Sequence, residues 1–444
     1  MESSPLHRDI PAYDEDIDFV VLASQDPDFA KVVDPASKTI NFKDPKAVQQ
    51  LTKSLLKRDF GVSIELPDDR LCPPVPVRYN YVHWIQSLLD TTSDRYDDRY
   101  DPDRKVLGLD IGTGASCIYP LLATSTRPQW RMFGTEVDSH SLDYAEHNVH
   151  LNDLEDRISL RRSTCDGPLI PLGALGLKQI NFTICNPPFY SSKDDMESGH
   201  ASKAVPPSAV CTGAEIEMIC EGGDAGFVCR MIDESLVLRD RVQWYTSMLG
   251  KLSSLHTVVA RLKEAGVKNW AITVLRAGSK TRRWAVGWSF VDRRPRNDIA
   301  RDSDISHALL PLPAAQTIAT FLKAQDASHS LNVILSGLNL RWDPATGIGF
   351  AKENVWSRAA RRKLMRQRAD QGTSGGAEAS NTVMEDNSTT QTSNDNGQED
   401  ATLGFKTMVE DRAVTVRWLE GEDFVLFESF CSMLKRSLST RTQS

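Results

Sequence analysis

The sequence predicts an α/β fold, in which a doubly wound parallel sheet carries helices on both faces. Two observations lead to this prediction. Between about residues 100 and 290, short apolar runs of strand length alternate with segments whose apolar residues recur at helical spacing. A glycine turn at 112–114 directly follows the first of these runs and opens a helical segment. Sheets of this kind bind ligands beyond the carboxyl ends of their strands, so functional residues are expected in the turns there.

The predicted elements can be followed in order along the chain. The first is a helix that begins after Pro45, and its apolar residues share one face. These residues are Ala47, Val48, Leu51, Leu55 and Leu56. Predicted strands cover residues 105–110, 131–137, 158–162, 180–185, 269–276, 284–291 and 412–420. Predicted helices cover residues 115–124, 141–152, 234–250, 257–265 and 424–438.

Length and cysteine usage limit the class of protein. A chain of 444 residues can form two or three domains. No apolar stretch approaches the roughly 20 residues that a membrane helix needs, and the first residues lack the apolar core of a secretion signal. The eight cysteines form no C-x-x-C pairs and do not cluster with histidines. We therefore expect a nuclear or cytosolic protein with reduced thiols, no membrane association and no metal site.

Charge and composition change along the chain and indicate its domains. The net charge of −8 excludes a uniformly basic nucleic-acid binder, but residues 357–368 carry six basic residues and no acid. Residues 369–402 are rich in Ser, Thr, Asn, Gly and acids, so they are predicted to be disordered. We predict three domains, at residues 1–75, 76–296 and 297–444, the last interrupted by the segment 369–402.

Gly112 and Gly114 follow the first predicted strand, where a ligand would bind. Glycines allow a tight turn and let the backbone approach a ligand where a Cβ atom would collide. Glu136 ends the next strand, 22 residues beyond Gly114, where a carboxylate can accept both hydroxyls of a ribose. Asp110 can hold the turn or contact an amino group of the ligand. The pattern is only G-x-G, so an ordinary strand–helix turn with a surface acid is the alternative to a nucleoside-cofactor site.

The run N-P-P-F at 186–189 directly follows the predicted strand 180–185. The side-chain oxygen of Asn186 accepts one hydrogen bond, and Pro187 has a fixed φ that can hold its carbonyl as a second acceptor. Two converging acceptors suit an –NH2 group, and Phe189 offers a face for a flat ring, worth roughly 1–3 kcal/mol. The run would hold an adenine base or a side-chain amide beside an electrophilic methyl group at the glycine turn. The alternative is a strand terminator with an incidental asparagine.

These motifs together resemble a known family of enzymes. Class I S-adenosylmethionine-dependent methyltransferases that modify adenine at its exocyclic nitrogen have motifs similar to D-I-G-T-G-A-S-C-I-Y-P-L, T-E-V-D and C-N-P-P-F. The chain resembles one group more closely, the eukaryotic U6 small nuclear RNA adenine-N6 methyltransferases. Bacterial relatives of that group modify large-subunit ribosomal RNA. Their segments are similar to N-F-K-D-P-K-A-V, L-C-P-P-V-P-V-R-Y-N-Y-V-H-W and R-R-W-A-V-G-W-S-F. The resemblance spans residues 17 to about 291.

The resemblance implies a Rossmann-like class I methyltransferase domain at 76–296, preceded by an N-terminal RNA-binding module at 1–75. It implies S-adenosyl-L-methionine as the cofactor. With the turn residues, the expected cofactor site comprises Arg78, near the cofactor's carboxylate end, and Asp110, Gly112, Gly114, Glu136 and Asn186. The expected catalytic residues are Asn186, Pro187, Pro188 and Phe189. Basic positions expected to face RNA are Lys43, Lys280 and Arg283, each of which is otherwise read as an ordinary solvated cation.

The C-terminal region and two loops complete the comparison with this family. The segments N-V-W-S-R-A-A-R-R-K and V-R-W-L-E-G-E-D-F resemble a small α+β accessory domain that adds RNA affinity. The basic run 357–368 would then contact phosphates, with a nuclear-import signal or a solvated helix face as alternatives. Asp166 stands near a position that is basic in the animal enzymes, which puts autoinhibition by the loop after the third strand in doubt. The polar loop 191–213 is expected to become ordered around RNA.

The predicted function is N6 methylation of an unpaired adenosine in a structured RNA, because the amine is inaccessible inside a stacked helix. U6 small nuclear RNA is the expected substrate, and the nucleus is the expected location. One alternative is ribosomal RNA adenine-N6 methylation, and another is methylation of a protein glutamine amide, whose enzymes use a similar tetrapeptide that ends in Tyr. A third is an RNA-binding splicing or translation factor with a catalysis-independent role. The oligomeric state stays open.

Overall fold

The computed structural model describes residues 10–201, 213–277, 281–360, 362, 366 and 401–440 of the 444-residue chain. Lys280 lies outside these described residues, as does most of the segment 369–402 that is predicted to be disordered. Part of the basic run 357–368 also falls outside them. Among the helices that are described, none is both long enough and apolar enough to cross a membrane.

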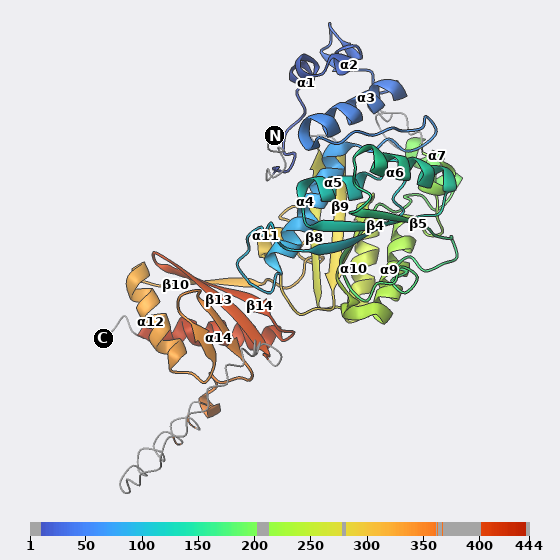
Figure 1. Ribbon diagram of the computed structural model, residues 1–444. Coiled ribbons are helices and arrows are strands. Elements are labelled where there is room, and N and C mark those ends of the chain that lie inside the picture. The colour runs from blue at the N-terminus through green and yellow to red at the C-terminus, as the bar shows by residue number, and fades with distance from the viewer. Residues whose placement is uncertain are drawn as a thin grey trace, which may run out of the picture. The chain divides into compact units, whose positions relative to one another are not determined.

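The chain forms two compact units (Figure 1). The first consists of Met1–Val291 and Asn297–Pro311, and the second of Asp292–Arg296 and Leu312–Ser444. This division differs from the predicted domain limits at residues 75 and 296. The N-terminal residues belong to the first unit, and so does α11 (Asn297–Ala300). In α11 the Ile299 carbonyl accepts a hydrogen bond from the Trp84 indole of the first unit over 2.8 Å.

The first unit is built on a seven-stranded sheet with the strand order β5-β4-β3-β6-β7-β9-β8. The strands are β3 (Val106–Ile111), β4 (Trp130–Glu136), β5 (Ile158–Arg162), β6 (Ile180–Cys185), β7 (Val242–Leu249), β8 (Asn269–Ala277) and β9 (Thr281–Ser289). Strands β3 to β7 pair in parallel, whereas β9 runs antiparallel between β7 and β8. The predicted parallel sheet is therefore a mixed one, with a single antiparallel strand near one edge.

The register of the central strands fixes where their turns begin. Ile111 of β3 is level with Thr135 of β4 and with Cys185 of β6. Because these strands are parallel, the residues that follow them leave the sheet at the same edge. Gly112 and Asn186 therefore open two adjacent turns.

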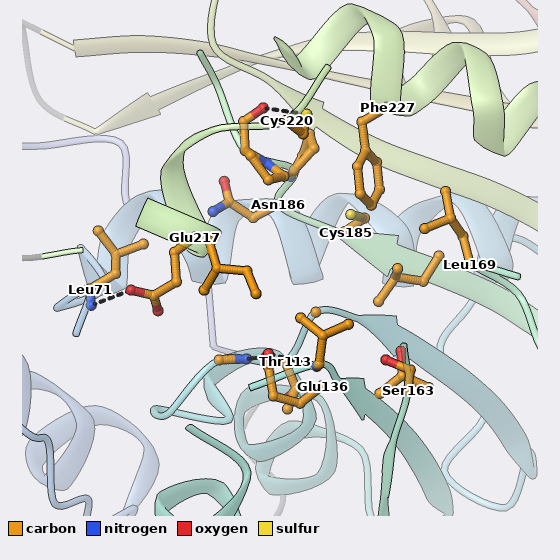
Figure 2. Close-up of a pocket in the computed structure, with 18 of the residues that line it drawn as sticks. Leu71, Thr113, Glu136, Ser163, Leu169, Cys185, Asn186, Glu217, Cys220 and Phe227 are labelled. Atoms are coloured by element: carbon orange, nitrogen blue, oxygen red, sulfur yellow. Dashed lines mark hydrogen bonds between the residues drawn. The ribbon is translucent and has the colours of Figure 1, made fainter. Parts of the chain in front are cut away.

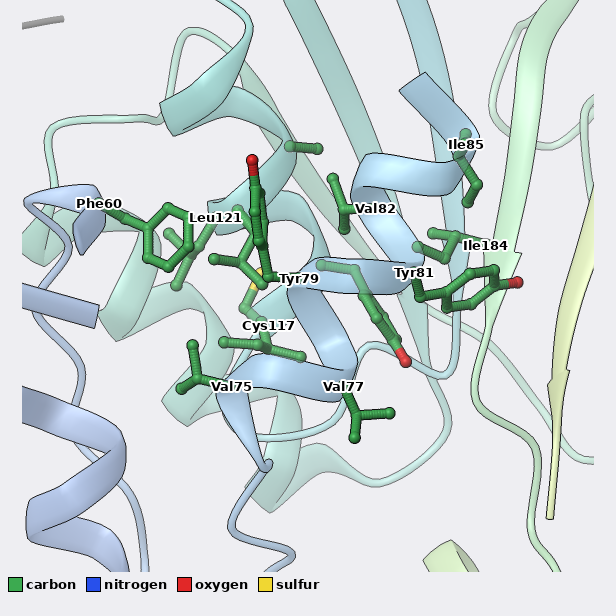
Figure 3. Close-up of a cluster of buried hydrophobic side chains, with 14 of the residues drawn as sticks. Phe60, Val75, Val77, Tyr79, Tyr81, Val82, Ile85, Cys117, Leu121 and Ile184 are labelled. Atoms are coloured by element: carbon green, nitrogen blue, oxygen red, sulfur yellow. The ribbon is translucent and has the colours of Figure 1, made fainter. Parts of the chain in front are cut away.

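Helices cover both faces of this sheet. One core includes residues of α4 (Val75–Thr91), α5 (Ile118–Thr126) and α6 (Ser139–Leu151). The other includes residues of α9 (Gly223–Leu238) and α10 (Leu252–Glu264). Figure 3 shows part of the first core, where Tyr81 and Val82 of α4 share a cluster with Ile184 of β6. Burial of each large apolar side chain there contributes roughly 1.5–3 kcal/mol.

One predicted element is wrong. Residues 234–250 were predicted as a helix, but they contain the end of α9 and the whole of β7. Trp244 and Tyr245 are fully buried in the two different cores, so β7 is covered on both faces. A strand buried on both faces shows no polar–apolar alternation, and its periodicity does not distinguish it from a buried helix.

The N-terminal residues form a helical cap. Its elements are α1 (Phe19–Gln25), α2 (Pro27–Ala30), the short strands β1 (Val33–Asp34) and β2 (Thr39–Ile40), and α3 (Pro45–Leu55). The helix predicted after Pro45 is confirmed as α3, and the Asp44 side chain caps it by accepting the Lys46 N–H. A π-helical turn, Leu56–Phe60, ends the cap.

An extended segment, residues 61–72, joins the cap to α4, and we call it the strap. Asn148 of α6 and Asn152, which directly follows that helix, hold the strap as a neighbouring strand would. Asn148 accepts the Glu65 N–H over 2.7 Å and donates to the Glu65 carbonyl over 2.9 Å. Asn152 makes the same pair of bonds with Ser63, over 2.9 and 2.7 Å. The strap backbone is thus paired without joining a sheet.

The second unit is a small α+β structure, as predicted for the C-terminal region. Its antiparallel sheet has the order β10-β14-β13-β12-β11. The elements are β10 (Ala315–Ala319), α12 (Ala324–Ser336), β11 (Arg341–Asp343), β12 (Ile348–Ala351), β13 (Leu403–Glu410), β14 (Ala413–Glu420) and α14 (Phe424–Thr440). The strand predicted at 412–420 and the helix predicted at 424–438 are confirmed. In the polar loop predicted at 191–213, residues Lys193–Ala201 form a helix, α7.

We expect the substitution Asn148→Ala to lower the free energy of unfolding by about 2–3 kcal/mol, because it leaves partly buried backbone groups of the strap and the buried Ala115 carbonyl unpaired. Asn148 is fully buried and also donates to the Ala115 carbonyl. Asn152→Ala removes the same kind of bonds at a more exposed position and serves as the matched control, with an expected loss of about 1 kcal/mol. Urea denaturation measures both, and equal losses would contradict this account.

Candidate active site

A cavity of about 370 Å3 opens at the carboxyl edge of the central sheet. Its wall is formed by the turns after β3, β4 and β6, the loop after β5, the start of α4, the end of the strap and the short helix α8 (Glu215–Met218). In Figure 2, Asn186 and Cys185 lie on one side of the cavity, and Thr113 and Glu136 lie on the other. The volume suits a ligand of nucleoside size.

The predicted glycine turn lines this cavity. Gly112 has φ +72° and Gly114 has φ +64°, a conformation that side chains with a Cβ atom rarely adopt. The N–H groups of Gly112 and Thr113 donate to the Thr135 carbonyl over 3.0 and 2.9 Å, which ties the turn to β4. A Cβ atom on Gly112 would meet nothing within 4 Å. The backbone conformation explains this glycine, and the space beside it is open to a ligand.

Glu136 joins the end of β4 to the glycine turn. It lines the cavity and is only 6% exposed. One carboxylate oxygen accepts the Gly114 N–H over 2.8 Å. The other accepts the N–H groups of Val137 and Asp138 over 2.8 and 3.0 Å. Each oxygen can accept more than one bond, so these contacts position the carboxylate while leaving it able to accept hydroxyl groups of a ligand.

Asp110, on β3, is fully buried and does not itself line the cavity. Neither carboxylate oxygen has a hydrogen-bond partner among the described residues, and the neighbouring Thr113 hydroxyl donates to the Cys117 thiol over 3.6 Å. Burial raises the pKa of Asp110 to about 7; the Thr113 hydroxyl and the charge of Arg78 oppose this rise, and the charge of Glu136 adds to it. A buried carboxyl without a partner beside a cavity is a group that a cationic ligand would stabilise in its charged form.

Arg78, on α4, supplies a buried positive charge to the same cavity. It is 5% exposed, and it lines the cavity. Its Nη1 donates to Asn186 Oδ1 over 2.9 Å, to the Tyr119 hydroxyl over 3.1 Å and to Met248 Sδ over 3.0 Å. None of these partners is an anion, so the guanidinium can still bind a carboxylate of a ligand.

The N-P-P-F run follows β6, as predicted, and three of its residues line the cavity: Asn186, Pro187 and Pro188. The Pro187 carbonyl accepts no hydrogen bond from any described residue. After the run, Tyr190 exchanges backbone bonds of 3.0 Å with Met218 and Cys220. The run is therefore fixed at both ends, by β6 and by the segment around α8.

Phe189 does not line the cavity, although its ring was predicted to stack on a ligand. The ring packs beside Gly250, where a Cβ atom would lie 2.9 Å from it. Gly250 is held by the buried carboxylate of Asp224, which accepts the Gly250 N–H over 2.7 Å and the Ser254 hydroxyl over 2.6 Å. Phe189 thus has a fixed position that depends on the lack of a side chain at Gly250.

The predicted RNA-facing cations are in different settings. Lys43 is exposed in the turn before α3, and Lys280 lies outside the described residues. Arg283, on β9, is partly buried with its guanidinium 5.5 Å from the centre of the Phe189 ring. Burial lowers the pKa of Arg283, and the charge of Arg78 adds to this effect. Arg283 is therefore placed beside the N-P-P-F run, whereas Lys43 belongs to the N-terminal cap.

Glu217 is a cavity residue that sequence reasoning missed. One of its oxygens accepts the N–H groups of Ala214 and Leu71 over 2.8 and 3.2 Å, the latter drawn in Figure 2. It therefore connects α8 to the strap. Burial raises the pKa of Glu217 above the ordinary carboxyl value, and the charge of Glu136 contributes. No local signal marks such a residue, because a single acid in a short polar helix resembles any surface acid.

These residues fit a nucleoside cofactor with a charged tail. The cavity has the required size, and the backbone of the glycine turn faces open space in it. Glu136 lines the cavity where it could accept hydrogen bonds from ribose hydroxyls. Arg78 provides a cation without an anionic partner, and Asp110 a carboxyl without any partner. An amino-acid tail, which carries one carboxylate and one ammonium, matches this pair of charges.

Comparison with known proteins identifies relatives along most of the chain. A family model described as RNA methyltransferase matches residues 1–292. The U6 small nuclear RNA (adenine-(43)-N(6))-methyltransferase of Schizosaccharomyces pombe is 36% identical over 404 residues, which cover 90% of this chain and 95% of that protein. A shared sequence of this extent indicates a common fold and a common family.

Solved structures give the same result for the first unit. The hMettl16 catalytic domain in complex with a MAT2A 3′UTR hairpin is 39% identical, with a TM-score of 0.56, and the match covers 65% of this chain and 98% of that one. The N-terminal domain of human METTL16 in complex with SAH is 36% identical, with a TM-score of 0.52, and the match covers 65% and 99%. By its sequence and its fold, the chain belongs to this RNA methyltransferase family.

Proposed function

We propose that this protein transfers a methyl group from S-adenosyl-L-methionine to the exocyclic N6 amine of an unpaired adenosine in RNA, and that its substrate is U6 small nuclear RNA. One observation carries the proposal. Asn186 and Pro187, two adjacent hydrogen-bond acceptors, line the same cavity as the glycine turn of β3. That arrangement places a site for a planar amine next to a site for a nucleoside cofactor.

The cofactor would be held by residues from three elements. Arg78 of α4 would bind its carboxylate, Glu136 would accept hydroxyl groups of its ribose, and the backbone at Gly112 would lie against it. The neighbouring carboxyl of Asp110 would balance its positive charge. When bound, this cofactor supplies an electrophilic methyl group.

The protein would accelerate the transfer by orienting the target amine. Asn186 Oδ1 and the Pro187 carbonyl would each accept one N–H of the adenine amine, which aims the nitrogen lone pair at the methyl group. Both oxygens would also stabilise the positive charge that develops on the nitrogen. Phe189 and Arg283 stand next to the run and would contact the base or its backbone. The base must be unpaired to reach this site.

The choice of RNA rests on the relatives and on basic residues. The fission yeast relative is named for adenine 43 of U6 small nuclear RNA, and the hMettl16 structure holds an RNA hairpin. Lys43 and Arg283, with Lys280, are proposed to contact RNA phosphates or bases. A nuclear location follows from the proposed substrate and stays a prediction.

The central test is transfer of a labelled methyl group to RNA. We expect label at N6 of one adenosine when the protein is incubated with labelled cofactor and U6 small nuclear RNA. Asn186→Ala should lower the rate by at least about 100-fold, because it removes an acceptor that acts in the transition state, while RNA affinity measured without cofactor changes little. Mass spectrometry of digested RNA locates the label, and label in protein glutamine instead would refute the proposal.

A second prediction concerns the position of the Phe189 ring. Gly250→Ala should lower the methylation rate by at least about 10-fold, because the new Cβ atom displaces the ring. Cofactor affinity should stay within about 2-fold, since Gly250 does not line the cavity. Gly173→Ala is the matched control, because a Cβ atom there meets nothing within 4 Å. Equal rates for the two variants would show that Phe189 is not held in this way.

A third prediction concerns pH. The pKa of Asp110 is raised to about 7, so its carboxyl gains charge as pH rises through that value, and a cationic ligand binds the charged form more tightly. Affinity for S-adenosyl-L-methionine should therefore increase by up to about 8-fold between pH 6 and pH 7.5. Isothermal titration calorimetry measures this change. Asp110→Asn should flatten the profile, and an unchanged slope in that variant would assign the titration to another group.

A further inference from the structure

We propose that Arg78 couples the two halves of the active site, so that a cofactor carboxylate bound at Arg78 strengthens the binding of the target amine at Asn186. The inference rests on the function proposed above and adds a positioning role for Arg78, exerted through Asn186. It makes base recognition dependent on prior occupancy of the cofactor site.

The observation behind it is a single hydrogen bond. Arg78 Nη1 donates to Asn186 Oδ1 over 2.9 Å, and Oδ1 is the atom that the adenine amine requires as acceptor. The guanidinium also touches the Tyr119 hydroxyl and Met248 Sδ, both neutral groups. No described carboxylate forms an ion pair with Arg78, although the side chain is almost completely buried. Asn186 therefore accepts a hydrogen bond from a cation that forms no ion pair with the described residues.

The bond from Arg78 weakens Asn186 Oδ1 as an acceptor for a second hydrogen bond. A bond from a charged donor is stronger than one from a neutral amine, and it draws electron density away from Oδ1. The buried positive charge also opposes the positive charge that develops on the amine during transfer, and at low effective dielectric that repulsion is strong. Both effects disfavour base binding while the guanidinium has no anion.

A carboxylate in the cavity would reverse both effects. A guanidinium binds a carboxylate through two parallel N–H bonds, which neutralises the cation and competes with Asn186 for its donors. Linkage is reciprocal, so RNA should then tighten cofactor binding by the same factor that the cofactor tightens RNA binding. A coupling of roughly 10-fold lies within the range of such effects.

The experiment measures RNA affinity without catalysis. The probe is a U6 small nuclear RNA segment around adenine 43, titrated by fluorescence anisotropy with no ligand, with S-adenosylhomocysteine, or with 5′-methylthioadenosine. The last compound keeps the nucleoside and lacks the amino-acid tail. We expect S-adenosylhomocysteine to tighten RNA binding roughly 10-fold and 5′-methylthioadenosine to leave it unchanged. In an RNA with purine ribonucleoside at the target position, which lacks the amine, both ligands should have no effect.

Two variants test whether Arg78 is responsible for the coupling. Arg78→Met should abolish the effect of S-adenosylhomocysteine on RNA affinity, measured at ligand concentrations that saturate the variant. Tyr119→Phe is the matched control, because it removes another partner of Nη1 and leaves Asn186 in place, and it should retain the coupling. If Arg78→Met does not fold, the comparison of the two ligands and two RNAs in the unaltered protein still decides the question.

Two results would overturn the inference. One is RNA affinity that does not respond to S-adenosylhomocysteine, and the other is an equal response to both ligands or to both RNAs. These results differ from a failure of the proposed function, in which the protein would bind no S-adenosylhomocysteine or would not methylate the RNA.

Discussion

The site depends on one constraint, the parallel register of β3 with both of its neighbours. Ile111 is level with Thr135 and with Cys185, so three turns begin at the same height along one edge of the sheet. A shift of one residue in either pairing would reverse which side chains face each core, and burial on both faces opposes that shift. The N–H groups of the glycine turn therefore lie within hydrogen-bond distance of the Thr135 carbonyl and the Glu136 carboxylate.

Features with a local cause could be predicted from the sequence. The strands before Gly112 and Asn186 are short apolar runs bounded by turn residues, and both proved to be strands that end at the cavity. The helix after Pro45 has a cap and an apolar face within a dozen residues. By contrast, β7 is buried on both sides, and its sequence, which does not alternate regularly between polar and apolar residues, was misread as a helix. The antiparallel direction of β9 depends on pairing between distant segments, which no local pattern contains.

Within the site, residue types were predictable and their partners were not. Arg78, Glu136 and Asn186 reach the expected cavity, whereas Asp110 lies behind it and Phe189 beside it. The bond between Arg78 and Asn186 joins residues 108 positions apart, and Glu217 receives Leu71 from 146 positions away. Such contacts arise from the packing of α4, the strap and α8 around the sheet. They also decide the surroundings of Arg78, which is buried at the cavity with neutral hydrogen-bond partners.

The strap is held in a different way, by two amides at the C-terminal end of α6 that bind its main chain. Asn148 and Asn152 bind only main-chain N–H and carbonyl groups of Glu65 and Ser63. Any amino acid except proline presents those groups. Substitutions at Ser63 and Glu65, which are exposed, can therefore leave the path of the strap unchanged, provided that the two amides remain. Val62 and Ile64, by contrast, are buried in the core, so tolerance of substitution should alternate from one residue of the strap to the next.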